Sequence, residues 1–363
     1  MKLRTIYQTL LIFIMSQVVI FSVFARSPLR YVPQDKEENT ILEKNHRGAH
    51  FTPWHFSSPE KIRKILGHYE QSNLNTIVIA MKTENGLLPY ASRVELAQKI
   101  GASKAVIKDV KRLVREFHNR GIYTIARVVV FQDTILSKGQ PEWALSKDGN
   151  WTKPYHPMVW KYNLSIIKEL VDFGFDEINF DYIRFPNPGD KGVYKRADSY
   201  CRPYEAIEGF LEYVYKDIKS YNNSVKLSAD VFGIACMNKK EDIAILGQRI
   251  DHMAKFLDFI CPMNYPSHIA DEFSAINNPR FHPYEAMKYL TEKTLGKTMV
   301  TKAQVRPWIQ DFPYRVNNIF NGGYVLSQIK AVNDTEATGW LAWNAWGKYS
   351  WPVYQKKKEL FPL

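Results

Sequence analysis

Short runs of apolar residues alternate along the chain with longer segments in which apolar residues recur every three or four positions. The short runs are rich in Val, Ile, Phe and Tyr and predict β-strands, whereas the three- and four-residue spacing predicts amphipathic helices. Strands are predicted at residues 47–53, 76–82, 123–133, 176–186, 226–235, 256–265, 298–308 and 339–344. Helices are predicted at residues 58–71, 105–119, 162–173, 204–221, 243–255, 283–295 and 324–333.

Eight predicted strands, with a helix after each of the first seven, favour a (β/α)8 TIM barrel, an α/β fold that forms a single domain. A doubly wound open sheet is the alternative, but the number of units and the lack of a glycine-rich phosphate-binding turn count against it. The longest connections, residues 134–160 and 187–203, follow the third and fourth strands and are expected to rise above the C-terminal face of the barrel.

The first 25 residues have the features of a targeting segment. Lys2 and Arg4 precede an apolar run at 10–24, and Val23 and Ala25 provide small residues for cleavage of a signal peptide. The run is slightly long for a cleaved signal, so retention as an N-terminal membrane anchor stays open. Residues 26–46 are predicted to be a linker and residues 47–363 the barrel domain. We therefore expect an exported protein of the periplasm, the cell envelope or the medium.

Composition narrows the partners that the protein is expected to bind. With 45% hydrophobic and 24% charged residues, the chain has the composition of an ordinary folded protein. The net charge of +12 favours anionic partners such as an acidic glycan, but no dense run of Lys and Arg predicts nucleic-acid binding. Aromatic residues reach 14%, a surplus that suits a sugar-stacking surface. Cys201, Cys236 and Cys261 are predicted to be buried free thiols, with a Cys236–Cys261 disulfide left open.

The segment DEINFDYIRFP at 176–186 carries the most informative chemistry. It predicts a buried strand that presents Asp181, Tyr182 and Arg184 at its C-terminal end, where barrels of parallel strands place catalytic groups. A buried carboxylate costs desolvation energy unless it is hydrogen-bonded or used in function. The structural alternative is an Asp181–Arg184 ion pair that fixes the loop. Arg127, midway along the third strand, is expected to be a buried charge partner.

Polar and aromatic residues also follow the other strands and are expected to converge on the same face of the barrel. We expect substrate binding by Trp54, Tyr182, Arg184, Asn264, Tyr265, His268, Arg306, Trp308, Gln310, Trp343 and Asn344. Indole faces stack on sugar rings, while amides and guanidinium groups hydrogen-bond to hydroxyls. This set therefore predicts a cleft for a polysaccharide or an oligosaccharide.

Two carboxylates at these strand ends fit glycosidic-bond cleavage, which needs one protonated and one ionised carboxyl group. Asp181 and Asp230 come from adjacent strands, and a spacing of about 4.8 Å between strands brings both within reach of one bond. Like-charge proximity raises the pKa of one carboxyl group and supplies the acid. Asp230 as a turn-capping residue is the alternative, with Asp133 as the reserve acid. No His-x-His, HExxH, GxxxxGKS/T or GxSxG motif is present, so neither a metal nor another cofactor is expected.

Five sequence blocks resemble a bacterial family of glycoside hydrolases, long catalogued as a domain of unknown function, in the broad glycosidase group of (β/α)8 barrels. The blocks are FDYIRFP at 180–186, SADVFG at 228–233, CPMNYPSH at 261–268, RPWIQDF at 306–312 and GWLAWNA at 339–345. The similarity runs from about residue 47 to residue 350. By analogy with amylase-like barrels, the resemblance implies a nucleophile on the fourth strand and an acid on the fifth. The matching residues are Asp181 and Asp230, although that wider group often has Glu as the acid.

The sequence thus predicts an exported glycoside hydrolase that acts on a polysaccharide, with Asp181 as nucleophile or stabilising carboxylate and Asp230 as general acid/base. Two alternatives stay open. One is a non-catalytic carbohydrate-binding barrel of the cell envelope, and the other is an envelope scaffold whose cleft is filled by its own loops. Membrane association would follow if the N-terminal segment is retained.

Overall fold

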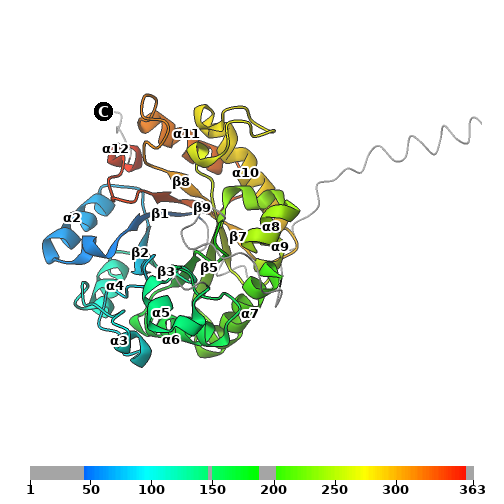
Figure 1. The fold of residues 1–363 in the computed structure, drawn as a ribbon. Coiled ribbons are helices and arrows are strands. Elements are labelled where there is room, and N and C mark those ends of the chain that lie inside the picture. The colour runs from blue at the N-terminus through cyan, green and yellow to red at the C-terminus, as the bar shows by residue number, and fades with distance from the viewer. Residues whose placement is uncertain (1–44, 146–148, 188–201, 357–363) are drawn as a thin grey trace, which may run out of the picture. The chain divides into compact units, whose positions relative to one another are not determined.

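The computed structural model describes residues 45–145, 149–187 and 202–356. Parallel strands in these residues form one sheet that closes into a barrel (Figure 1), because the last strand, β9, pairs with the first, β1. The strands are β1 His46–Phe51, β2 Thr76–Lys82, β3 Tyr123–Val129, β4 Glu177–Asp181, β5 Lys226–Phe232, β6 Phe259–Met263, β7 Gln304–Val305, β8 Trp308–Gln310 and β9 Gly339–Trp343. This closed sheet confirms the predicted (β/α)8 TIM barrel.

The seventh position of the barrel is shared by two short strands. Val305 of β7 pairs with Ile260 of β6, and Trp308 of β8 pairs with Met263 further along β6. Pro307 separates the two strands and, having no backbone N–H, cannot donate to the ladder. The predicted strand at 298–308 begins too early, because Thr298 still belongs to the preceding helix.

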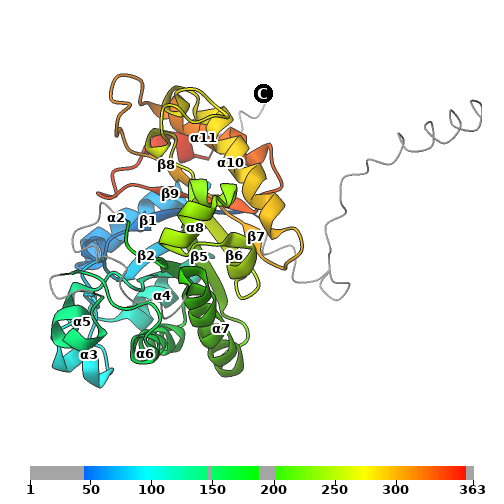
Figure 2. The same cartoon turned by 45° about the vertical axis from the view of Figure 1, so that its right-hand side comes forward.

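Helices surround the barrel on its outer side (Figures 1 and 2). They are α2 Pro59–Glu70, α3 Glu95–Lys99, α4 Val110–His118, α5 Thr134–Gly139, α6 Pro157–Phe173, α7 Pro203–Tyr221, α8 Lys240–Leu246, α9 Ile250–Met253, α10 Pro283–Thr298, α11 Gly322–Asn333 and α12 Trp351–Tyr354. The predicted helix at 243–255 is divided into α8 and α9 at Gly247, whose positive φ of 79° ends α8. The short helices α3 and α5 have no counterpart among the predicted elements.

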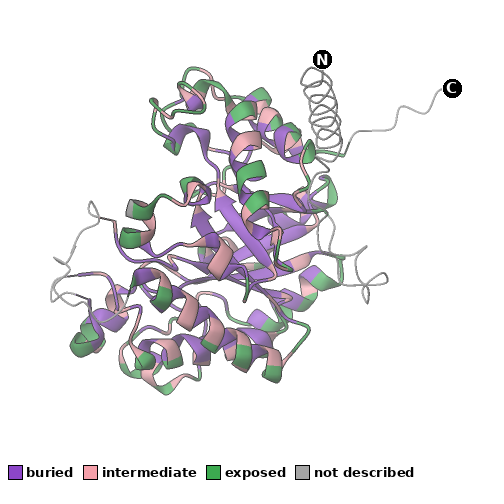
Figure 3. Cartoon of the chain, turned by 90° about the vertical axis from the view of Figure 1, so that its right-hand side faces the viewer, coloured by how far each residue is buried: buried purple, intermediate pink, exposed green. Residues whose placement is uncertain are grey.

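Burial explains why the strands read as continuous apolar runs in the sequence. All seven residues of β2 are buried, which is typical of parallel strands covered on both faces. Figure 3 shows the same contrast for the described residues, with buried strands inside and exposed helix surfaces outside. The main apolar core lies between strands and helices, and a second cluster that includes Val78, Ile125 and Phe259 lies inside the barrel.

Several sequence predictions concern residues outside the described ranges. The targeting segment and Cys201 lie outside them, as does most of the 187–203 connection. Cys236 and Cys261 are free and buried, as predicted. Among the described residues, no helix is both long enough and apolar enough to span a bilayer.

Candidate active site

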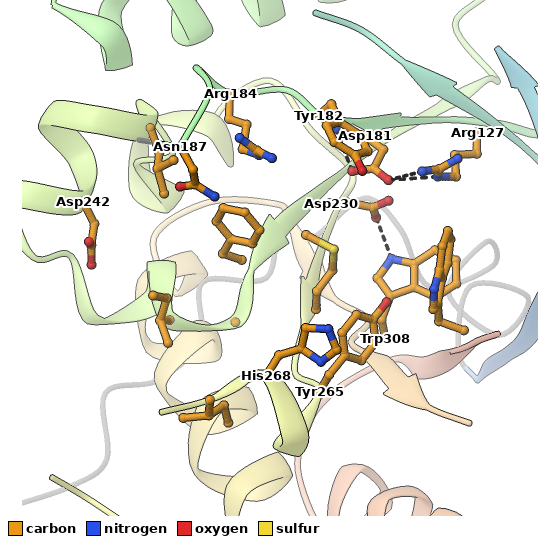
Figure 4. A pocket seen from close by; sticks show the side chains of 17 residues that line it. Arg127, Asp181, Tyr182, Arg184, Asn187, Asp230, Asp242, Tyr265, His268 and Trp308 are labelled. Atoms are coloured by element: carbon orange, nitrogen blue, oxygen red, sulfur yellow. Dashed lines mark hydrogen bonds and ion pairs between the residues drawn. The ribbon is translucent and has the colours of Figure 1, made fainter. Parts of the chain in front are cut away.

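A pocket of about 450 Å³ opens at the C-terminal ends of the strands (Figure 4). Its size is within the usual range for a small-molecule site. Eight of the predicted site residues line it: Asp181, Tyr182, Arg184, Asp230, Tyr265, His268, Trp308 and Trp343. The other lining residues are Arg127, Asn187, Phe232, Gly233, Ile234, Asp242, Leu246, Met263 and Ile269. The structure thus brings together both carboxylates that the sequence singled out.

Asp181, the last residue of β4, is held on both of its carboxylate oxygens. Its Oδ2 accepts hydrogen bonds from Nε of Arg127 at 2.9 Å and from Nη2 at 2.5 Å. Its Oδ1 accepts the backbone N–H of Tyr182 at 2.6 Å. Tyr182 reaches this position with a φ of 50°, a left-handed conformation that costs energy for a residue other than glycine. These contacts suit an ionised and fixed carboxylate.

Arg127 links this carboxylate to a third acidic group. Its Nη2 also donates to Glu84 at 2.9 Å, and the Glu84 side chain is 44% exposed, whereas the Arg127 side chain is only 2% exposed. The structure therefore confirms Arg127 as a buried charge partner. The cation paired with Asp181 is Arg127 on β3, where the alternative interpretation had placed Arg184, three residues beyond the end of β4.

Asp230 lies in a different environment on β5. Its Oδ1 accepts hydrogen bonds from Nδ2 of Asn179 at 2.9 Å and from Nε1 of Trp308 at 2.6 Å. The residue is 1% exposed, and burial, followed by the negative charge of Asp181, raises its pKa well above the usual value. Asp230 therefore favours the neutral, protonated form while Asp181 is paired with a cation.

The local sequence explains why the two carboxylates face each other. Residues 179 and 181 point to the same face of β4 because side chains alternate along a strand. Asn179 pairs in register with Ser228 of β5, and its amide bonds to Ser228 at 3.0 Å and to Asp230. Asp230 is two residues beyond Ser228, so it occupies the position next to Asp181 at the mouth of the barrel.

Aromatic side chains form much of the pocket wall. Trp308 and Trp343 meet edge to face, with ring centroids 5.6 Å apart. Trp343 stacks on the buried ring of His50 at 4.1 Å, and the guanidinium of Arg127 lies 5.0 Å from the centre of its ring. Tyr265 packs edge to face with His268 at 5.5 Å. The wall is thus built from rings held by neighbouring rings.

Arg184 forms a separate part of the wall. Its guanidinium carbon lies 4.8 Å from the ring centre of Trp151, 5.2 Å from that of Tyr182 and 4.9 Å from that of Phe232. Its Nη1 donates to the carbonyl of Phe185 at 2.9 Å. This cation is therefore set among aromatic faces.

Five predicted substrate-binding residues do not line the pocket: Trp54, Asn264, Arg306, Gln310 and Asn344. Arg306 lies deeper inside the barrel, where it forms a fully buried ion pair with Glu177. The break at Pro307 explains this depth, because Arg306 follows the β7 residues that pair with the start of β6. Trp54 stands on the molecular surface with 56% of its area exposed.

The three amides of this group brace loops. Asn264 donates to the hydroxyl of Thr291 at 3.2 Å. The side-chain oxygen of Gln310 accepts the N–H of Ser267 at 3.2 Å. Asn344 donates to the carbonyl of Lys348 at 2.8 Å. Asp133, the reserve acid, is likewise structural, since it pairs with Lys82 at 2.9 Å and caps α5. Strand-end position alone does not distinguish such braces from residues that face the pocket.

Some lining residues were missed by the sequence prediction. Phe232 is two residues beyond Asp230 and therefore on the same face of β5, so strand periodicity could have identified it. Asp242 and Leu246 come from α8, far from any strand end, and no sequence signal points to them. Among the described residues, no group of three or more His, Cys, Asp and Glu side chains is arranged to hold a metal ion.

Comparisons with known proteins agree with this architecture. No curated protein matches the chain. A hypothetical protein from Ruminiclostridium thermocellum ATCC 27405 is 33% identical, with a TM-score of 0.45, over 50% of this chain and 97% of that chain. The glycoside hydrolase domain of PgaB (BpsB) from Bordetella bronchiseptica has a TM-score of 0.60 at 12% identity, over 85% of this chain and 95% of that chain. A class V chitinase from Pseudomonas fluorescens Pf-5 has a TM-score of 0.52 at 10% identity, over 85% of this chain and 98% of that chain.

The last two likenesses show a shared fold. A family model described as "putative glycosyl hydrolase domain" matches residues 48–349, which is nearly all of the barrel. The chain therefore belongs to this glycosyl hydrolase family.

Proposed function

We propose that this protein cleaves glycosidic bonds in a polysaccharide, with Asp181 as the ionised carboxylate and Asp230 as the general acid/base. The observation that carries the proposal is the contrast between two neighbouring carboxyl groups in one pocket. Asp181 is paired with Arg127, whereas burial raises the pKa of Asp230. One ionised and one protonated carboxyl group are the pair that glycoside hydrolysis requires.

In the proposed reaction, Asp230 gives its proton to the glycosidic oxygen as the bond from that oxygen to the anomeric carbon breaks. Oδ1 of Asp230 is occupied by Asn179 and Trp308, so Oδ2 is the oxygen that carries the proton. Asp181 meets the positive charge that develops at the anomeric carbon, as nucleophile or as stabilising carboxylate. Water then adds to that carbon and returns a proton to Asp230.

The pocket wall supports a sugar as the substrate. Tyr265 and Trp343 line it with aromatic surface, on which the apolar face of a pyranose ring stacks. Arg184 and His268 provide nitrogen donors for hydroxyl groups. The net charge of +12 favours a polysaccharide that carries acidic groups.

Export belongs to the same proposal. Residues 1–25 combine Lys2 and Arg4 with an apolar run, as targeting segments do. We propose that this segment directs the barrel out of the cytoplasm, to the periplasm, the envelope or the medium. If the segment is retained, it associates the protein with the membrane through residues 26–46.

The test is a reducing-end assay with wild type, Asp181→Asn and Asp230→Asn on a panel of neutral and acidic polysaccharides. Loss of a general acid should lower the rate by about 10²–10⁴-fold. Asp258→Asn is the matched control, because Asp258 is a half-buried carboxylate outside the pocket that accepts the N–H of Leu227 and pairs with Lys219, directly before β6. An unchanged rate in Asp181→Asn would refute the mechanism. Glycan binding without product in the wild type would instead identify a non-catalytic carbohydrate-binding barrel.

A further inference from the structure

We propose that Trp54 and Trp346 form a sugar-stacking surface on the rim of the barrel, which holds the polysaccharide outside the catalytic pocket. The inference deepens the proposed function and rests on it for the identity of the ligand. It assigns a role to two indoles that do not line the pocket. It also predicts that the enzyme prefers long chains to short oligosaccharides.

The two indoles are among the most exposed large apolar side chains of the described residues, at 56% for Trp54 and 79% for Trp346. Trp54 lies in the short helix η1, Pro53–Phe56, directly after β1, and Trp346 follows β9. These strands are paired neighbours, from His46 with Gly339 to Ala49 with Ala342, so both indoles emerge from adjacent strands at the C-terminal face.

The two turns that carry the indoles also touch. A Cβ atom on Gly347 would lie 2.5 Å from Nε2 of His55, so the turn after β9 is packed against the η1 turn. His55 directly follows Trp54 and Gly347 directly follows Trp346. The indoles are therefore attached to abutting segments of backbone.

Both turns are fixed by hydrogen bonds, although the rings themselves face solvent. The N–H of Trp346 donates to Oδ1 of Asn344 at 2.9 Å, and the buried Asn344 amide holds the carbonyl of Asp311 at 2.6 Å. The carbonyl of Trp54 accepts Nζ of Lys61 at 3.1 Å and Oγ of Ser57 at 3.0 Å. A fixed backbone lowers the entropy lost when a ligand stacks on the rings.

The apolar character of the two indoles and their closeness in sequence to the pocket residue Trp343 indicate which ligand they bind. Exposed indoles that carry no charge match the apolar face of a sugar ring, and two of them need a ligand longer than one residue. Trp346 is three residues beyond Trp343, which lines the catalytic pocket, so one connection carries both the pocket wall and the rim. A polysaccharide strand that leaves the pocket beside Trp343 is the occupant we infer.

The first test measures binding by affinity electrophoresis of full-length Asp181→Asn in gels that contain soluble xylan, glycol chitosan or polygalacturonate. Adding Trp54→Ala and Trp346→Ala should weaken the retardation by about tenfold or more, as expected for the loss of two stacking contacts. Adding Trp54→Phe and Trp346→Phe, which keeps two ring faces, should retain most of it. Tyr221→Ala is the matched control, since Tyr221 is 51% exposed and ends α7 at the opposite end of the barrel. Melting curves check that each variant folds.

The second test uses the catalytically intact chain and compares kcat/KM on the polysaccharide with kcat/KM on its shortest cleaved oligosaccharide. The alanine pair should lower this ratio by about tenfold, mainly through KM. An unchanged ratio and unchanged retardation would overturn the rim surface while leaving the proposed function intact. Retardation that depends on the indoles, without hydrolysis by the wild type, would overturn the proposed function and support the surface. No retardation of the parent by any of the polysaccharides would overturn the surface.

Discussion

Asp230→Asn should make the protein more stable at neutral pH while lowering its activity by about 10²–10⁴-fold. The asparagine keeps an oxygen for the hydrogen bonds from Asn179 and Trp308, and it copies the shape of a protonated carboxyl group. It cannot give up a proton and so cannot serve as the acid. It also cannot become a buried negative charge, and this second property gives the test its thermodynamic readout.

The size of the expected stability difference follows from the one proton that Asp230 binds in the folded state. Because burial raises the pKa of Asp230, the folded wild type holds a proton that the unfolded chain has lost, at every pH between the unfolded and the folded pKa. The free energy of unfolding then falls by about 1.4 kcal/mol per pH unit. This stability is fully present below the unfolded pKa and is lost as pH rises through the folded pKa. At about 2 °C per kcal/mol for a large domain, the melting temperatures of variant and wild type should diverge by about 3 °C per pH unit.

The assay is a series of thermal melts from pH 4 to about pH 8, run beside the rate measurements. Asp258→Asn should behave in the opposite way. Burial opposes ionisation of Asp258, but the charges of Lys219 and Lys302 outweigh burial and lower its pKa. Its carboxylate therefore stabilises the fold above the unfolded pKa, and this contribution is lost as pH falls through the folded pKa. Parallel melting curves for wild type and Asp230→Asn would show that Asp230 holds no extra proton, and would refute its role as the acid.

Three further changes test the surrounding network. Arg127→Met should lower the free energy of unfolding by about 3–5 kcal/mol, because it leaves Asp181 buried without a cation. If this is the cause, thermal melts of the double variant with Asp181→Asn should show that part of the lost stability is recovered. Glu84→Gln should cost less than about 1 kcal/mol in the same melts, because Glu84 is 44% exposed and water screens its pair with Arg127; a loss as large as that of Arg127→Met would contradict this view. Trp308→Phe removes an N–H that stabilises ionised Asp230, so the pKa of Asp230 should rise and the basic limb of the pH–rate profile should move to higher pH. If the basic limb does not move, the Trp308 hydrogen bond does not set the pKa of the catalytic acid.

The barrel was predictable because its signal is local and repeated. The apolar run at 76–82 matches β2 to the residue, since a strand buried on both faces contains only buried positions. Errors occur where tertiary structure interrupts a local pattern. Pro307 divides the seventh position between β7 and β8, and Gly247 ends α8 within a continuous helical periodicity. Neither break changes the order of strands.

The candidate site was predictable to the level of strand ends. The alternation of side chains along β4 and β5 was enough to place Asp181 beside Asp230, since the C-terminal ends of neighbouring parallel strands lie at the same end of the barrel. The cation that pairs with each carboxylate was not predictable. Arg127 was predicted to be a buried charge partner, but nothing in the sequence shows that Arg127 on β3, and not Arg184, is the cation that pairs with Asp181. The depth of Arg306 depends on a break in the ladder that only the three-dimensional register reveals.

Charge balance inside the barrel gives a physical reason for the protonated state of Asp230. Two buried ion pairs are stacked within it, Arg306 with Glu177 and, nearer the mouth, Arg127 with Asp181. Each pair is neutral as a whole. The two buried histidines add no charge: burial and then the charge of Arg306 lower the pKa of His46 to about 3, and burial lowers that of His50.

The carboxyl group of Asp230 is therefore the one that would leave an uncompensated charge in this layer if it ionised, and burying such a charge is costly. A protein gains nothing in stability from a carboxyl group placed there, because an amide would make the same hydrogen bonds without the penalty. This agrees with the role that we propose for Asp230, in which the proton that it holds is released to a ligand. The same reasoning separates Asp230 from Asp133, whose carboxylate has its own cation in Lys82 and caps a helix. Of the two buried carboxyl groups that line the pocket, Asp181 has a cation and is the fixed charge, whereas Asp230 has none, which is why we propose Asp230 as the acid.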